Sequence, residues 1–499
     1  MFLRLGLISF ALLLASRVSG LVRESAQAAA FGISGNADIA ILMLTLPDLL
    51  VNVFFLGGLS YIALPLWASQ SPQDRANSQR TMLVWCLGVG TALALLLLLT
   101  RQWVIQILAP GLPQAFMATA NHGIAWSALL IAPTCLAALW YCRLQFERDF
   151  IGLYGWNVLV NGVMILAFVA IHAWYPEDSI ATFLGLALLL AMVLRLLWQA
   201  WRLSRLDLPG RVKSRAAITW PGAHQFAWAA LAAGLPLTIP LIARTLSAAN
   251  GEGALAIFNY AIKLVELPNA LAIQLVTTLA FPSVTRALAA WRKSNPSSGD
   301  ATGPLPDMRS VRSAYILAWA LACAGAAGLA VGSQPIAALL FGWGRMRGAD
   351  VLAVAELSAV GAWSLLPQAL IAVTVTVLAA NQQLKLIALS FLITAAAFVL
   401  VGWQSGVHLT STQAINCMNA SFVVLATALM TKSRMLIWRS LPALEMAIVS
   451  VATAVCVIVA SYIHLSGFHA QMALACSAAL VVGLIGLAVS PSLRSALKR

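Results

Sequence analysis

The stretch LVWCLGVGTALALLLLL, Leu83–Leu99, contains no charged side chain. With its flanks it is long enough to cross the hydrocarbon core of a bilayer, which takes about 20 residues as a helix. Similar apolar runs occur at Val158–Ala173 and Met472–Val489. In the whole chain 61% of residues are hydrophobic and 9% are charged, and the mean hydropathy is +0.89, whereas soluble domains have about 25% charged residues. The sequence therefore predicts an integral membrane protein.

Counting the apolar runs between polar or Gly/Pro-containing breaks predicts an all-α membrane fold with about 14 transmembrane helices. The predicted helices lie near 3–30, 37–69, 80–109, 119–143, 152–174, 179–204, 224–247, 253–289, 310–330, 349–379, 383–403, 411–431, 440–464 and 468–490. The first one resembles a signal peptide, because Arg4 precedes an apolar run over Leu5–Ala15. Arg17 and Arg23 follow the apolar run at once, without a clean A-x-A cleavage site directly after it, so we expect the segment to remain as a helix.

The net charge of +14 would suggest nucleic-acid binding in a soluble protein. In membrane proteins, Lys and Arg gather instead in cytoplasmic loops. With the N-terminus placed in the cytoplasm, the outer side holds little beyond Arg101, Arg345 and Arg347, and the inner side holds most other basic residues. We therefore expect both termini in the cytoplasm and no nucleic-acid partner.

Two polar connections interrupt the apolar pattern. Residues 295–307 have the Pro, Gly and Ser composition of a flexible loop. The stretch from Arg202 to His224 contains Trp220 and several cations, which is typical of an amphipathic segment on an anionic inner leaflet. We expect residues 205–223 to form a cytoplasmic amphipathic linker between two helical bundles.

A weak internal repeat also indicates two bundles. The sequence LPDLL at Leu46–Leu50 resembles LPNAL at Leu267–Leu271, and each is followed by a second proline, Pro65 or Pro282. Transporters built from structural repeats place bent helices at equivalent positions of the two halves.

Motifs for catalysis and cofactor binding are missing from the sequence. The seven cysteines lie in or beside apolar runs without CxxC spacing, and the six histidines fall near predicted helix ends or in loops. We find no HExxH, Walker or GxGxxG motif. The sequence therefore predicts a protein that is not an enzyme and has no metal or cofactor, driven by an ion gradient, the membrane potential or the substrate gradient.

Ionised residues inside the predicted helices are the candidate site, since each costs at least about 2.5–3.5 kcal/mol near the bilayer centre. They are Arg17, Arg23, Glu24, Asp38, Arg244, Lys263 and Glu266. Arg17 and Lys263 lie deepest, and those near helix ends could reach the interface instead. Lys263 and Glu266 are three residues apart and could simply pair. The excess of cations predicts a cavity for an anion, and guanidinium groups match phosphate, so pyrophosphate is a suitable ligand.

Several motifs resemble the MurJ/MviN lipid II flippase family within the multidrug/oligosaccharidyl-lipid/polysaccharide exporter superfamily. They are Ser16-Arg17-Val18-x-Gly20-x-x-Arg23-Glu24, Phe31-Gly32, Ala37-Asp38, Leu46-Pro47-Asp48-Leu49-Leu50 and Tyr260-Ala-Ile-Lys263-Leu-Val-Glu266-Leu-Pro268. The resemblance implies a bacterial inner-membrane transporter that moves undecaprenyl-pyrophosphate-linked lipid II to the periplasmic leaflet by alternating access. Membrane lipids and cell-wall synthesis proteins are the partners it implies.

The same resemblance implies two six-helix lobes plus two C-terminal helices. The N-terminal lobe would cover residues 1–204 and the C-terminal lobe residues 224–431, while residues 440–490 would form a groove for the lipid tail. Carried over by position, the substrate-binding residues are Arg17, Arg23, Asp38 and Lys263, and the supporting residues are Glu24, Asn52, Arg244 and Glu266. We expect Asp38 to orient or gate one of the arginines.

The chain departs from the family pattern at two places. A basic pair usual after the LPxLL motif is replaced by Val51 and Asn52, and lysine replaces the usual arginine at Lys263. Arg244 could supply the missing charge. Three alternatives therefore stay open: a flippase for an exopolysaccharide or O-antigen unit, a drug or cation antiporter of the same superfamily, and a polytopic glycan polymerase or ligase.

Overall fold

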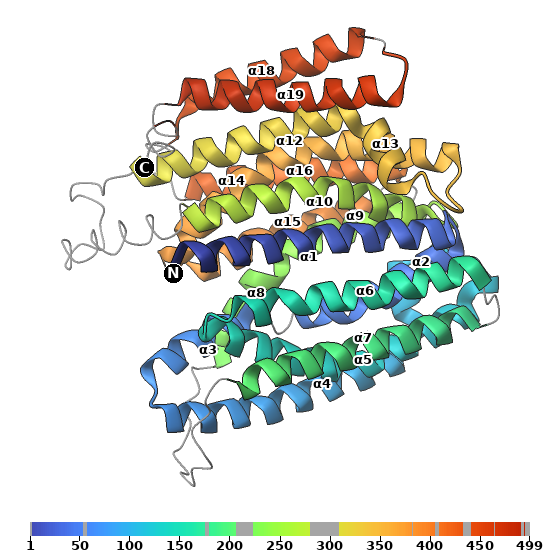
Figure 1. Cartoon of the computed structure of the whole chain (residues 1–499), viewed down its shortest axis with the longest axis vertical. Helices are drawn as coiled ribbons and strands as arrows, with labels where there is room; N and C mark the ends of the chain where they lie inside the picture. Colours follow the sequence, from blue (N-terminus) through green and yellow to red (C-terminus); the bar gives the residue numbers. More distant parts are fainter. Residues whose placement is uncertain are drawn as a thin grey trace. The chain divides into compact units, whose positions relative to one another are not determined.

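The structure is a computed structural model, and it describes residues 2–52, 57–174, 179–205, 223–279, 309–381, 383–404, 409–432, 441–463, 465–490 and 494. The regular elements in these ranges are all helices (Figure 1). The predicted loop at 295–307 and nearly all of the predicted linker at 205–223 lie outside them. The chain forms two compact units: unit 1 comprises Met1–Ala256 with Leu340–Arg347, and unit 2 comprises Ile257–Leu339 with Gly348–Arg499.

Unit 1 is a helical bundle with one central helix. Its helices are α1 (Phe2–Phe31), α2 (Gly35–Val51), α3 (Gly57–Ser69), α4 (Pro72–Leu108), α5 (Met117–Phe146), α6 (Phe150–Trp174), α7 (Ile180–Ser204), α8 (Ala223–Gly234) and α9 (Thr238–Ala248). Helix α5 packs against α2, α4 and α7, while α1 packs along α6 (Figure 1). The predicted helix at 224–247 is interrupted by a 3-10 turn at Leu235–Leu237, where Pro236 supplies no backbone N–H.

Unit 2 contains most of the C-terminal half. Its helices are the larger part of α10 (Ala254–Leu279), α12 (Arg309–Phe341), α13 (Gly348–Gly361), α14 (Leu365–Ala380), α15 (Leu384–Gln404), α16 (Ser411–Lys432), α18 (Ala443–Tyr462) and α19 (Phe468–Val489). Helix α16 contacts α13, α14 and α15. The boundary between the units falls inside α10 and near the end of α12, and the predicted lobes remain a prediction.

The last two helices of unit 2 lie side by side and share a core with α12 (Figure 1). Ile316, Cys323 and Ala327 of α12 pack with Val449 of α18 and Val482 of α19. A Cβ atom at Gly332 of α12 would lie 2.4 Å from the Cβ of Ala475 on α19. Small residues of this kind allow membrane helices to approach closely, so glycine is required for this contact.

Apolar side chains lie on the outer surface of the helices as well as in the core. Large apolar side chains such as Leu99 and Leu444 are exposed. Among the described residues, eleven helical segments are long and apolar enough to cross a membrane. An integral membrane fold with all-α architecture is therefore confirmed, and the count of fourteen helices stays a prediction.

The turn between α5 and α6 depends on one carboxylate. Asp149 precedes α6, and its Oδ1 accepts a hydrogen bond from the backbone N–H of Gly152 at 3.1 Å. Arg202, near the end of α7, donates to the same carboxylate through Nε at 2.7 Å and Nη2 at 2.5 Å. This fork joins α7 to the start of α6, with the Asp149 side chain only 8% exposed.

We expect Asp149→Ala to destabilise the protein by about 2–4 kcal/mol, because it removes a helix cap and leaves a partly buried guanidinium unpaired. Thermal unfolding of the purified protein in detergent measures the change. Asp74→Ala is the matched control, since Asp74 lies at the exposed start of α4. Equal melting temperatures for the two variants would contradict this assignment.

Candidate functional site

Arg23 lies in a short polar network between α1 and α6. Its Nη2 donates to Oε1 of the neighbouring Glu24 at 2.6 Å, and its Nη1 donates to Oδ1 of Asn161 at 3.3 Å. Asn161 in turn donates to the hydroxyl of Ser19 at 3.0 Å. The Arg23 side chain is 25% exposed and Glu24 is 7% exposed. The guanidinium is thus neutralised by Glu24 and oriented by α6.

Asn161 was not singled out by sequence reasoning, although it is buried and holds Arg23 in place. Its one signal is an amide side chain in the middle of an otherwise apolar run. Arg17, six residues before Arg23, is exposed on α1. We find no ion pair or hydrogen bond between Arg17 and the residues that the structure describes.

Asp38 caps a helix that is distant in the sequence. Its Oδ2 accepts from the backbone N–H of Gly253 and its Oδ1 from that of Ala256, each at 2.8 Å. These N–H groups form the N-terminus of α10, where the helix dipole favours a negative charge. Both oxygens of this buried carboxylate therefore bind backbone. We expected Asp38 to contact an arginine, but its hydrogen-bond partners are backbone N–H groups at the start of α10.

A second carboxylate makes the reverse contact. Oε1 of Glu252, just before α10, accepts from the backbone N–H of Gly35 at 2.9 Å, at the start of α2. Each helix start is thus held by an acidic side chain from the other segment. The approach is close at Gly253, which has φ of +77°, because a Cβ atom there would lie 2.3 Å from Cγ2 of Ile33. Only glycine suits this position.

The segment 340–347 of unit 1 joins the same region. The backbone N–H of Arg345 donates to the carbonyl of Ala29 at 3.0 Å, and the hydroxyl of Ser25 donates to the carbonyl of Leu340. Gly344 has φ of +61°, and a Cβ atom there would lie 2.4 Å from the oxygen of Ala29. We call Ala29–Asp38, Glu252–Ala256 and Leu340–Arg347 together the turn junction.

The remaining predicted residues have their own contacts. Arg244 of α9 is half-buried, and its Nη1 is 3.5 Å from the hydroxyl of Thr45 on α2. Asn52 follows α2 and donates its backbone N–H to carbonyls of the last turn of that helix. In unit 2, Nζ of Lys263 lies 2.7 Å from Oε2 of Glu266, so the pair expected from the spacing is present. Their side chains are 30% and 51% exposed.

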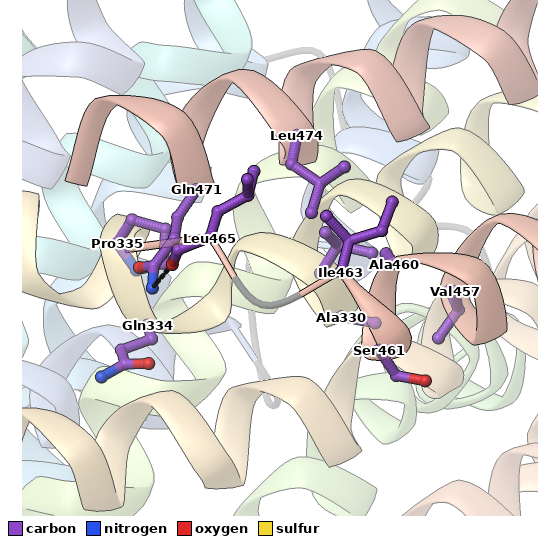
Figure 2. A pocket seen from close by; sticks show the side chains of 11 residues that line it. Ala330, Gln334, Pro335, Val457, Ala460, Ser461, Ile463, Leu465, Gln471 and Leu474 are labelled. Carbon is purple, nitrogen blue, oxygen red and sulfur yellow. Dashed lines mark hydrogen bonds between the residues drawn. The ribbon is translucent and has the colours of Figure 1, made fainter. Parts of the chain in front are cut away.

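The predicted groove at 440–490 coincides in part with a pocket of about 320 Å³ in unit 2. Figure 2 shows side chains from α12, α18 and α19 around it, with Leu474, Ile463 and Val457 supplying apolar wall. Gln334, Ser461 and Gln471 add polar groups, and Gln471 donates to the carbonyl of Leu465 at 3.2 Å. None of the described residues in the lining is charged.

Comparison with known proteins identifies relatives over most of the chain. Residues 27–489 match the family described as "Lipid II flippase MurJ", a range that includes Asp38 and Lys263 but begins after Arg17 and Arg23. The chain is 30% identical over 298 residues to "Lipid II flippase MurJ" of Burkholderia cenocepacia, covering 55% of each protein. It is 26% identical over 364 residues to "Probable lipid II flippase MurJ" of Rhizobium meliloti, covering 70% of this chain and 64% of the relative. The matched regions thus span about half to two thirds of these relatives.

Solved structures share the fold. A structure titled "Lipid II flippase MurJ, inward closed conformation" aligns over 99% of this chain and 100% of its own, with a TM-score of 0.77 at 15% identity. An inward-facing multidrug resistance MATE family transporter of the MOP superfamily aligns over 85% of this chain and 95% of its own, with a TM-score of 0.63 at 14% identity. At these identities the likeness establishes the fold.

We expect Asp38→Asn to destabilise the protein by about 1–2 kcal/mol, because an amide is a weaker acceptor than a carboxylate and its NH₂ group would face a backbone donor. Thermal unfolding in detergent measures the loss. Glu252→Gln provides the comparison, since it weakens a single bond to Gly35 and should cost less. If Asp38→Asn left the melting temperature unchanged, the cap would contribute nothing to stability.

Proposed function

Because this chain belongs to the MurJ family of lipid II flippases, we propose that it moves lipid II, an undecaprenyl-pyrophosphate-linked glycan, from the cytoplasmic to the periplasmic leaflet of a bacterial inner membrane. The proposal rests on the family match over residues 27–489 together with the paired cations of α1 and α10. The protein is a transporter and not an enzyme. Both termini lie in the cytoplasm in this proposal, and cell-wall synthesis proteins are its partners.

Arg17, Arg23 and Lys263 are the proposed pyrophosphate ligands. Guanidinium and ammonium groups form strong charge-assisted hydrogen bonds to phosphate oxygens. Arg23 is neutralised by Glu24 and Lys263 by Glu266. These carboxylates lower the cost of keeping the two cations in the membrane. A phosphate group that binds either cation competes with the neighbouring carboxylate, so its binding exchanges one ion pair for another.

The capped start of α10 supports the same proposal. Asp38 holds the first turn of the helix that carries Lys263, which gives this aspartate a positioning role. The pocket between α12, α18 and α19 supports a site for part of the polyprenyl tail, because most of the described side chains that line it are apolar and none of them is charged. In this proposal, alternating access exposes the pyrophosphate site first to the cytoplasmic side and then to the periplasmic side of the membrane.

We expect Arg17→Ala and Arg23→Ala each to reduce flipping at least about tenfold, since each removes charge-assisted hydrogen bonds to phosphate. The measurement is rescue of cells depleted of their own lipid II flippase, with membrane abundance followed by immunoblot. Arg101→Ala is the matched control, because Arg101 lies in α4 outside the proposed site. Full rescue by both α1 variants at normal abundance would contradict the cationic-site proposal. Failure of the wild-type chain to rescue the cells would indicate another glycan cargo.

The Lys263–Glu266 pair allows a sharper test. If Lys263 binds pyrophosphate, Lys263→Arg should preserve or improve transport, because guanidinium adds a bidentate fork, whereas Lys263→Met should abolish it. If Lys263 only neutralises Glu266, adding Glu266→Gln to Lys263→Met should restore abundance and transport together. Full transport by this double variant would rule out substrate contact by Lys263. The same depletion assay, normalised to abundance, gives the answer.

A further inference from the structure

Arg195 is a buried cation that the proposed mechanism does not use. It lies in α7 with 9% of its surface exposed, and its guanidinium stacks 3.7 Å from the ring centre of Trp156 on α6. Within the described part of the chain, Arg195 forms no hydrogen bond and no ion pair. A guanidinium buried in a membrane bundle is costly without an acceptor, so its retention needs a reason.

A cavity of about 110 Å³ in unit 1 lies against this residue. Arg195 of α7 and Trp156 of α6 line it together with Arg23 of α1, Asp48 of α2 and Asn161 of α6, all in the same unit. This volume has room for several water molecules, which is sufficient for a small oxyanion group.

Hydrogen-bond donors are in excess around this cavity. Nε of Arg195, Nε of Arg23 and Nε1 of Trp156 are buried N–H groups that lack a hydrogen-bond partner among the described residues. Among the described residues that line the cavity, Asp48 is the one carboxylate; it is exposed and forms no ion pair with a described cation. Two guanidinium groups and one carboxylate around the cavity favour an anionic ligand over a cation.

We propose that this cavity is an oxyanion subsite in which Arg195, together with Arg23, binds a phosphate group of the lipid-linked substrate. The identity of the substrate rests on the proposed function, whereas the affinity of the cavity for phosphate oxygens does not. Trp156 holds the planar guanidinium by stacking and leaves its N–H edge for the ligand. Asp48 weakens anion binding by repulsion and attracts Arg195 when the cavity is empty.

The test uses the full-length chain in nanodiscs, with undecaprenyl pyrophosphate and inorganic pyrophosphate as separate probes. We expect Arg195→Gln to raise the dissociation constant for both probes about tenfold or more, Arg195→Lys to have a smaller effect, and Asp48→Asn to lower it. Arg205→Gln is the matched control, because it removes the same charge from the exposed end of α7. Thermal unfolding without ligand shows whether each variant is folded.

The outcomes separate the two proposals. Arg195-dependent binding of inorganic pyrophosphate alone would support the subsite and overturn the proposed substrate. Unchanged affinity of folded Arg195→Gln for both probes would overturn the subsite, as would a wild-type protein that binds neither. If Arg195→Gln alters only the melting temperature, Arg195 is a packing residue. Loss of binding of both probes in Asp48→Asn but not in Arg195→Gln would likewise overturn the subsite.

Discussion

An ionised side chain inside a membrane bundle is costly unless an opposite charge or a hydrogen-bonding group lies beside it. The structure meets this constraint in three ways. Arg23 and Lys263 each pair with a carboxylate next to them in their own helix. Asp38 binds backbone N–H groups at a helix start. Arg195 stacks on the ring of Trp156 and shares a cavity with Asp48, where we propose that a ligand supplies its acceptor.

The reciprocal caps within the turn junction connect the starts of α2 and α10. Asp38 reaches the start of α10 and Glu252 reaches the start of α2, so the two helix starts hold each other. Helix α10 then continues past Ala256 into unit 2 and carries Lys263. Any movement of α10 during transport must either break the hydrogen bonds of these caps or leave them intact. Glycine at 253 and 344 permits backbone approaches that any side chain would block.

The structure shows the local contacts of the residues that depart from the family pattern. Asn52 replaces an expected cation after α2, and it serves as the cap residue of that helix. Arg195, further along the chain, supplies a cation to the cavity that Asp48 of α2 also lines. Lysine at 263 keeps the charge without the planar fork, and its pairing with Glu266 suits a point charge.

Composition and periodicity were enough to predict the membrane class, the all-α architecture and the approximate position of much of the described helical structure, because each depends on the solvent and on neighbours within one turn. The Lys263–Glu266 pair was predictable for the same reason, as i,i+3 residues share a helix face. The partner of Asp38 was not, since Gly253 and Ala256 are more than 200 residues away in the chain. The contacts of Asn161 with Arg23 and of Trp156 with Arg195 were likewise decided only by the tertiary structure. Contacts between helices that are distant in the sequence depend on how whole helix faces pack, and they leave no local pattern in the sequence.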